Sequence, residues 1–242
     1  LADGKTIINN AAKEPEIEDL SKCLNKMGAK IIGAGTEQIT IEGVNSLSKT
    51  EYTIMPDRIV AGTYLIAAII LNNEFMIKNF DPNLLHIPLK ILKEMGANLE
   101  IGNDFIKIFR SNKIKGTMLE TAPYPGFPTD LQAQIMVLMS IAKGNSRIRE
   151  KIFENRFMHV SELNRLGADI KIKNDIAYIT GEREFKGAQV MASDLRASVS
   201  LVLAGLCAEG ETTINRVYHL DRGYEKIEET LAKLGPKITR LK

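Results

Sequence analysis

The stretch LKEMGANL, residues 92–99, recurs in altered form three more times along the chain. The copies are LNKMGAKI at 24–31, LNRLGADI at 163–170 and LAKLGPKI at 231–238. Their glycines stand at 28, 96, 167 and 235, with spacings of 68, 71 and 68 residues. Each copy predicts a helix that ends at a glycine C-cap and is followed by a strand. A period of this length indicates an architecture of repeated structural units.

A second phrase alternates with the first, and each copy is an aspartate followed by an apolar helix. The copies begin at Asp57, Asp130 and Asp194. Their helices are apolar nearly all round, which is typical of buried helices, whereas the helices of the first phrase carry Lys and Glu and are expected at the surface. After each buried helix we expect a short strand, at residues 75–78, 146–149 and 212–215.

Strand pairs follow the first three copies of the glycine phrase. The second strand of each pair is predicted at residues 38–42, 105–109 and 176–180, after turn residues that favour hairpins. Gly33-Ala34-Gly35 is one such turn and lacks the context of a dinucleotide-binding loop. One unit is therefore strand, buried helix, strand, surface helix, strand, strand. The predicted fold class is α/β, built from repeated βαβαββ units.

The units divide the chain into two parts. Residues 50–242 hold three units, the last ending after its first closing strand, and residues 1–45 hold the second half of another. That half comprises a strand at 5–8, a helix at 16–27 and a hairpin, and an exposed connection follows it. Because a half unit opens the chain without an initiating Met, we expect the C-terminal part of a longer protein. An adapted capping element is the alternative.

The composition is that of an ordinary globular chain, 44% apolar and 26% charged, with a net charge of +2. This small net charge with interspersed signs predicts neither nucleic acid nor a membrane as partner. The longest apolar run, residues 64–71, is far shorter than a bilayer span. The two cysteines, Cys23 and Cys207, form no CxxC, so no disulfide framework or zinc site is expected and the cytoplasm is the predicted compartment.

Asp130 ends a loop broken by proline and glycine, YPGFPTD at 124–130, in front of an apolar helix expected to start at Leu131. One interpretation is a helix N-cap, in which the carboxylate accepts backbone N–H groups. The other is a general base, held at a rigid junction to take a proton from a substrate hydroxyl. Asp57 and Asp194 hold the same repeat position, which favours the cap for all three.

Six motifs together resemble the UDP-N-acetylglucosamine 1-carboxyvinyltransferase (MurA) family of enolpyruvyl transferases. They are NAAKEPE at 10–16, PDRI at 56–59, FPTDLQAQ at 127–134, FENRFMHV at 153–160, DLRAS at 194–198 and DRGYE at 221–225. The resemblance implies an inside-out α/β barrel of six βαβαββ units in two domains. Residues 1–45 would be the last portion of the N-terminal domain, which carries the catalytic loop, and residues 50–242 the C-terminal domain of three repeats.

The resemblance implies transfer of the enolpyruvyl group of phosphoenolpyruvate to the 3-hydroxyl of UDP-N-acetylglucosamine, with release of phosphate and no cofactor. This reaction is the first committed step of peptidoglycan synthesis, on which cell wall biogenesis, cell shape and cell division depend. Alternatives are enolpyruvyl transfer to shikimate 3-phosphate and a non-catalytic repeat module that binds a partner. By comparison with the family, the chain lacks the loop that carries the general acid, a Cys or an Asp. It is therefore expected to need the missing N-terminal portion and to be inactive alone.

Site residues follow from the resemblance, motif by motif. Asp130 would contact the sugar hydroxyl and serve as the base, and Arg222 would bind phosphoenolpyruvate. For Arg222, a surface ion pair with Asp221 or Glu225 is the alternative. The other residues implied to bind substrate are Glu14, Glu16, Asp57, Arg58, Ile152, Phe153, Glu154, Arg156, Asp194 and Arg196.

Some of these residues have plainer interpretations. Phe153 at a strand end is also typical of core packing. Glu14 and Glu16 stand at a helix start, where acids suit the helix dipole without any ligand. Cys23 and Cys207 are interpreted as structural. The three histidines are scattered without ligand spacing, so no metal site is predicted.

Overall fold

The computed structural model describes residues 1–241, and their contacts separate the chain into two units. The first unit comprises Leu1–Asp57 together with the loop Pro123–Gly126. The second unit comprises Arg58–Ala122 and the chain from Phe127 onward. Each unit has its own secondary structure and is described by itself.

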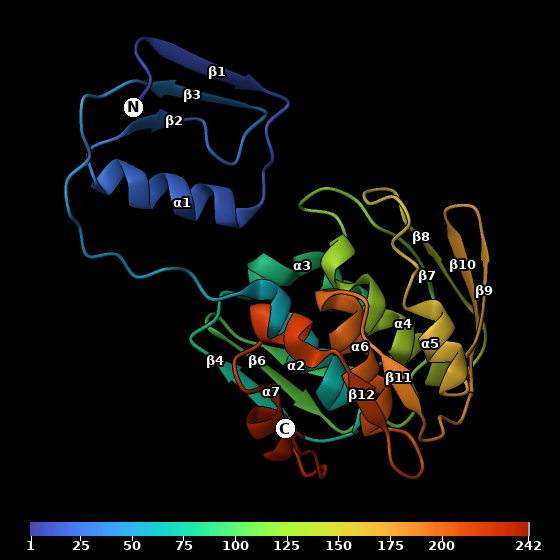
Figure 1. The fold of residues 1–242 in the computed structure, drawn as a ribbon. Helices are drawn as coiled ribbons and strands as arrows, with labels where there is room; N and C mark the ends of the chain where they lie inside the picture. The colour runs from blue at the N-terminus through green and yellow to red at the C-terminus, as the bar shows by residue number, and fades with distance from the viewer. Residues whose placement is uncertain (242) are drawn as a thin grey trace. The chain divides into compact units, whose positions relative to one another are not determined.

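The first unit is a three-stranded antiparallel sheet with one helix along its face (Figure 1). Its elements are β1 (Lys5–Asn9), α1 (Pro15–Lys26), β2 (Lys30–Ile32) and β3 (Gln38–Glu42). The strand order is β1-β3-β2, and β2 and β3 pair as the predicted hairpin. The strand, helix and hairpin predicted for this part are thus confirmed to within one or two residues.

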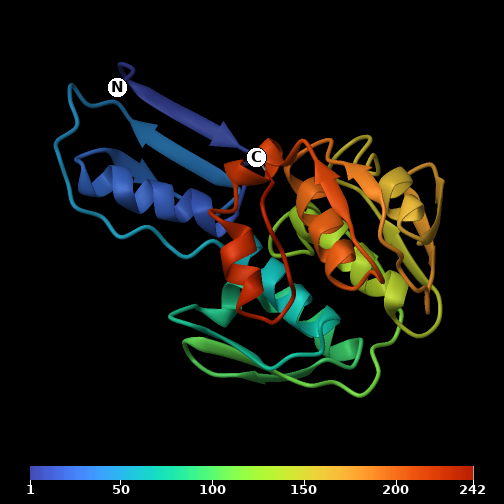
Figure 2. The same cartoon turned by 60° about the horizontal axis from the view of Figure 1, so that its bottom comes forward.

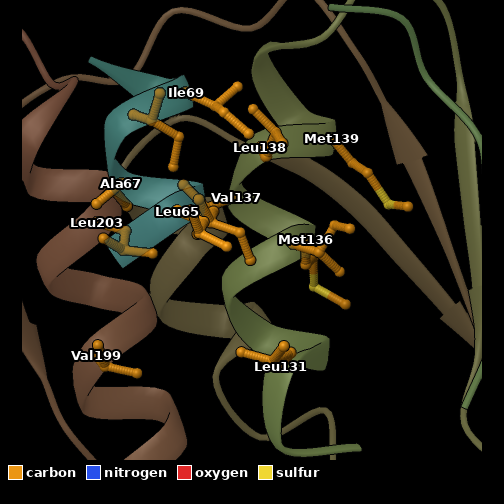
Figure 3. Close-up of a cluster of buried hydrophobic side chains, with 14 of the residues drawn as sticks. Leu65, Ala67, Ile69, Leu131, Met136, Val137, Leu138, Met139, Val199 and Leu203 are labelled. Carbon is orange, nitrogen blue, oxygen red and sulfur yellow. The ribbon is translucent and has the colours of Figure 1, made fainter. Parts of the chain in front are cut away.

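Three apolar helices form the centre of the second unit. They are α2 (Arg58–Ile70), α4 (Gln132–Ile141) and α6 (Leu195–Leu206), and nearly every residue of α4 is buried. A helix that is apolar on all faces can only be stable when other elements cover it on all sides. Figure 3 shows side chains of the three helices facing one another, among them Leu65, Val137 and Leu203.

Three small sheets pack around these helices (Figures 1 and 2). The strands are β4 (Phe75–Lys78), β5 (Asn98–Ile101), β6 (Phe105–Phe109), β7 (Met118–Glu120), β8 (Ser146–Arg149), β9 (Asp169–Lys173), β10 (Ile176–Thr180), β11 (Gln189–Met191) and β12 (Thr213–Asn215). Their orders are β4-β6-β5, β7-β8-β10-β9 and β11-β12. The pairs β7–β8 and β11–β12 are parallel, and the remaining pairs are antiparallel. The buried position predicted for the three apolar helices is thus confirmed.

Shorter helices complete the repeats on the outside. They are α3 (His86–Glu94), α5 (Val160–Arg165) and α7 (Ile227–Ala232), with 3₁₀ turns η1 (Pro82–Leu85), η2 (Thr129–Leu131) and η3 (Val217–Arg222). The glycines that follow α1, α3, α5 and α7 are Gly28, Gly96, Gly167 and Gly235. All four adopt φ between +101° and +109°, a region that favours glycine because it has no Cβ. The predicted glycine C-caps are confirmed.

Two details of the predicted repeats are wrong. Within residues 1–241 no strand follows Gly235; in the other repeats this strand pairs with a second strand further along the chain, and the described part of the last repeat offers none. Pro236 also lacks the N–H that a strand ladder needs. Residues 51–57 form no strand before α2, so the first of the three repeats has no opening strand.

The longest of the helices in the described chain, α2, has 13 residues. None in residues 1–241 combines the length and the apolar character needed to cross a bilayer.

Candidate functional site

Asp130 lies inside the turn η2, and its carboxylate is held by two arginines. Arg156 Nη2 donates to Asp130 Oδ1 at 2.6 Å, and Arg196 Nη2 donates to Asp130 Oδ2 at 2.6 Å. The N-cap position of η2 is taken by Pro128, and Asp130 caps neither η2 nor α4. The prediction of a cap at Asp130 is therefore wrong. Because the 3₁₀ turn starts at Thr129, Asp130 is already within it and its side chain points to the guanidinium groups instead.

Asp194, in contrast, is the predicted N-cap. One of its oxygens accepts backbone N–H groups from Arg196 at 2.8 Å and Ala197 at 3.0 Å, and Ser193 Oγ donates to the other at 2.9 Å. This cap fixes the first turn of α6, from which the Arg196 side chain reaches Asp130. The Asp194 cap therefore helps to position Arg196, and the Arg196 side chain makes the contact with Asp130.

Arg156 comes from the loop that follows β8. Its guanidinium lies 4.9 Å from the centre of the Phe153 ring, and its side chain is only 15% exposed. Asn155 in front of it adopts φ +55°, a left-handed conformation that Asn tolerates and that turns the chain sharply. These contacts indicate that Arg156 also supports the loop in which it lies.

The carboxyl groups of Asp130 and Asp194 both have a lowered pKa. Burial raises the pKa of the Asp130 carboxyl, but the hydrogen bonds and charges of Arg196 and Arg156 outweigh it, and the net pKa is lowered. The pKa of Asp194 is also lowered, because the backbone N–H groups and Ser193 outweigh the effect of burial. Two guanidiniums therefore share the single Asp130 carboxylate.

An open pocket of about 640 Å³ lies along the same loop. Its lining includes Glu150, the segment 151–158, Ile172, Asn174 and Asp175. The side chains of Ile152 and Phe153 are 44% and 56% exposed, so core packing is excluded for Phe153 within the described chain. Glu154 is exposed as well. The three residues predicted to contact a nucleotide sugar therefore line an accessible surface next to Arg156.

Arg222 is exposed at the end of η3, which packs against α6. Asp221 pairs with Arg240, at 2.7 Å, and within residues 1–241 Arg222 forms no ion pair with Asp221 or Glu225. The alternative of a surface pair is thus wrong. Tyr224, two residues after Arg222, is buried and shares a hydrogen bond of 2.8 Å with Thr63 of α2.

Thr63 also links this segment to Asp130. Gln134 Nε2 donates to Thr63 Oγ1 at 3.1 Å and to the Asp130 carbonyl at 2.8 Å. The chain of contacts from Tyr224 through Thr63 and Gln134 joins α2, α4 and the segment that follows η3. It fixes the Asp130 backbone from behind while the two arginines hold its side chain.

The remaining predicted residues lie at helix starts. Arg58 is the first residue of α2 and is 7% exposed, and Asp57 directly precedes it at the end of the first unit. Glu14 and Glu16 lie at the start of α1 in the first unit, and Glu14 caps the helix without a side-chain hydrogen bond. Acids in this place suit the helix dipole, as the plainer interpretation requires.

No cysteine or histidine in residues 1–241 bonds to the Asp130 carboxylate, although His159 is close enough to Arg156 and Asp194 for their charges to act on it. Burial raises the pKa of the Cys207 thiol to about 12, so it stays protonated, and Cys23 lies in α1 of the first unit. Burial lowers the pKa of His159 to about 4. Among residues 1–241 no group of three or more His, Cys, Asp or Glu side chains could hold a metal ion.

Sequence reasoning missed Glu150, whose buried carboxylate joins the turn of Asp130 to the pocket loop. It lies outside all six motifs, directly after β8. An acid among the basic and apolar residues RIREKIF at 147–153 was the only signal in the sequence.

Comparison with known proteins gives the family. A protein-family model described as EPSP synthase (3-phosphoshikimate 1-carboxyvinyltransferase) matches residues 1–231 of this chain. Proteins named UDP-N-acetylglucosamine 1-carboxyvinyltransferase are 55% identical in Rhodopseudomonas palustris (strain TIE-1) and 54% identical in Chelativorans sp. (strain BNC1), over all 242 residues. The chain spans 56% of the length of these curated relatives. The resemblance on which the sequence predictions rested is confirmed.

Solved structures agree with the fold. The enolpyruvyl transferase NikO from Streptomyces tendae has a TM-score of 0.86 and 29% identity, over 97% of this chain and 56% of that one. EPSP synthase from Acinetobacter baumannii has a TM-score of 0.76 over 100% of this chain and 59% of that one, and at 20% identity it supports the fold alone. The α/β fold of repeated units is confirmed. Together with the match over residues 1–231, these findings show that the chain belongs to the EPSP synthase family.

Proposed function

We propose that the protein transfers the enolpyruvyl group of phosphoenolpyruvate to the 3-hydroxyl of UDP-N-acetylglucosamine and releases phosphate. The observation that carries this proposal is the Asp130 carboxylate, held by Arg156 and Arg196 at 2.6 Å each. It lies in a chain 55% identical to proteins named for that activity. The protein would then serve peptidoglycan synthesis in the cytoplasm, without a cofactor.

Asp130 is the proposed base for the sugar hydroxyl. An ionised carboxylate has about four acceptor positions, and the two arginines occupy one on each oxygen. A hydroxyl can therefore bind without displacing either arginine. The lowered pKa keeps Asp130 ionised at neutral pH but makes it a weak base, so proton transfer accompanies the attack of the hydroxyl and does not precede it.

Cationic side chains are the proposed partners of phosphoenolpyruvate, which carries a phosphate and a carboxylate. Arg156 holds Asp130 through one N–H group of its guanidinium, and Arg222 is exposed without an acidic partner within residues 1–241. A guanidinium matches both anionic groups with paired hydrogen bonds. The pocket beside Phe153 and Glu154 is the proposed place of the sugar nucleotide.

The domain organisation belongs to the same proposal. Residues 50–242 form the C-terminal domain of three repeats, and residues 1–45 form the end of the N-terminal domain. The chain matches 56% of its relatives' length, and we place the general acid in the part of those relatives that it does not match. On this basis the 242 residues alone bind substrates but do not turn them over.

The test is an assay of phosphate release from phosphoenolpyruvate by the protein in its full natural length. We expect release with UDP-N-acetylglucosamine and none with shikimate 3-phosphate, and mass spectrometry of the nucleotide identifies the enolpyruvyl product. Release with shikimate 3-phosphate alone would replace the proposal by the sister reaction. If calorimetry detects binding of neither UDP-N-acetylglucosamine nor shikimate 3-phosphate, the protein is a non-catalytic repeat module.

A further inference from the structure

Glu150 is a buried carboxylate one residue beyond β8, with a side chain surrounded by donors. Glu150 as a whole is 6% exposed. Oε1 accepts from Thr121 Oγ1 at 2.7 Å and from the backbone N–H groups of Ile152 at 2.9 Å and Phe153 at 3.1 Å. Oε2 accepts from Thr129 Oγ1 at 3.0 Å. Four hydrogen bonds therefore satisfy one side chain.

No cation helps to hold this carboxylate. Within residues 1–241 Glu150 forms no salt bridge, although Lys151 and Arg149 flank it, because these two side chains pair with Glu120 and Asp175 instead. A buried carboxylate is costly unless hydrogen bonds replace its water, and two hydroxyls and two amides do so here. Such an arrangement specifies the position of each donor closely.

The donors come from the two segments that make the proposed active site. Thr129 directly precedes Asp130 in the turn η2. Ile152 and Phe153 begin the pocket loop, which continues to Arg156. Thr121 ties the arrangement to β8, because Lys151 N donates to Thr121 Oγ1 at 2.9 Å and Thr121 N donates to the Arg149 carbonyl at 2.9 Å.

The repeats show that the fold itself does not require an acid at this position. The residues that follow the corresponding strands β4 and β12 are Asn79 and Arg216. Both adopt positive φ, of 55° and 61°, whereas Glu150 is not in that region. Only the repeat that carries Asp130 thus places a buried carboxylate here, which indicates a role in the site and not in the architecture.

We propose that Glu150 is a positioning residue, which sets the distance between the turn that carries Asp130 and the pocket loop that carries Arg156. The inference rests on the proposed function for its consequence in turnover, but the contacts it explains can be tested without any activity. Oε2 holds Thr129, which precedes Asp130, and Oε1 holds the start of the pocket loop. Substitutions can therefore separate the two effects.

Three variants of the full-length protein separate them. Glu150→Ala removes all four bonds, and we expect the KM for UDP-N-acetylglucosamine to rise and kcat to fall, each by about tenfold or more. Glu150→Gln keeps Oε1 for both backbone amides and turns its NH₂ to Thr129 Oγ1, so KM should return to within about threefold of wild type. Thr129→Val removes only the Oε2 contact and should lower kcat with KM unchanged. Asp81→Ala is the control, because Asp81 also accepts a backbone N–H, from Asn83, but belongs to another repeat.

Hydrogen exchange of the Ile152 and Phe153 amides supplies the readout that is independent of turnover. We expect exchange about tenfold faster or more in Glu150→Ala, and close to wild type in Glu150→Gln and Asp81→Ala. Unchanged exchange of these two amides in Glu150→Ala would overturn the proposal. The proposal would also fail if KM rose and kcat fell in Thr129→Val by the same factors as in Glu150→Ala. Should Glu150→Ala not fold, the kcat and KM of Thr129→Val decide alone. Inactive wild type with fast exchange in Glu150→Ala would refute the proposed function and leave the positioning role supported.

Discussion

Asp130 and Asp194 hold the same place in neighbouring repeats, yet their carboxylates make opposite kinds of contact. Asp194 accepts the backbone N–H groups of its own helix start. Asp130 accepts none and is held by Arg156 and Arg196, which lie 26 and 66 residues further along the chain. The difference lies in one turn of backbone, since α6 begins directly after Asp194 whereas η2 begins before Asp130.

This comparison separates a structural aspartate from one available for chemistry. A cap uses the acceptor positions of a carboxylate to satisfy the helix itself. A carboxylate inside the turn presents both oxygens to side chains from elsewhere, as Asp130 does to Arg156 and Arg196. The same position of the repeat thus serves stability at Asp194 and a proposed reaction at Asp130.

The largest expected effect comes from Asp130→Asn. The amide keeps the shape of the side chain but removes the charge, the base and one acceptor for the arginines. We expect kcat for phosphate release to fall by about 100-fold or more, the scale of a lost general base. Asp81→Asn, at a capping carboxylate in another repeat, is the control with unchanged kcat. A kcat near that of wild type in Asp130→Asn would remove Asp130 from the reaction.

Arg196→Met should have the next largest effect, this time on stability. It leaves the partly buried Asp130 with one guanidinium, and we expect a loss of about 1 kcal/mol in the free energy of unfolding, discounted because Asp130 is 37% exposed. Urea unfolding of the single variants and of Asp130→Asn/Arg196→Met measures the coupling. Strictly additive losses would mean that the pair contributes nothing.

Replacement of the cap tests the other side of the comparison. Asp194→Ala should lower the free energy of unfolding by about 1 kcal/mol, because two backbone N–H groups of α6 lose their acceptor. Asp194→Asn should cost at most a few tenths of a kcal/mol, since Asn caps helices well. Urea unfolding checks both. Equal losses in the two variants would show that charge, and not capping, is what Asp194 supplies.

The smallest expected effect is on the dependence of stability on pH and salt. Both carboxyls have a lowered pKa in the folded state, so each contributes stability above its unfolded pKa of about 4, and this is lost as the pH falls through the folded pKa. The Asp130 contribution should also weaken in about 1 M salt, because it depends on ion pairs, whereas the cap of Asp194 should not. Unfolding of wild type, Asp130→Asn and Asp194→Asn from pH 3 to 7, at two salt concentrations, measures this. Identical salt responses would contradict the distinction.

Much of the fold followed from local patterns. The glycine phrase placed all four C-caps, and strands such as Gln38–Glu42 and Ile176–Thr180 were predicted to the residue. The strand expected after Gly235 does not form within residues 1–241, and Pro236 is only part of the reason. A strand is stable only with a partner, and the partner of a closing strand lies further along the chain.

The site was predictable only in part. The motifs named Asp130, Arg156 and Arg196, but nothing in them indicated that the three meet at 2.6 Å. Glu150 was missed altogether, because two of its four donors, Thr121 and Thr129, lie 29 and 21 residues away and become its neighbours only in the folded chain.

The sequence by itself determined the repeat, the buried and exposed helices and the capping glycines, because periodicity and backbone preference act within a few residues. The tertiary structure alone decided which aspartate caps a helix and which is clamped by arginines. Local preferences were the same for Asp130 and Asp194, so the outcome depended on the onset of the 3₁₀ turn and on guanidinium groups delivered from distant segments. Charge and burial at that meeting point, which no single segment contains, give Asp130 its chemistry.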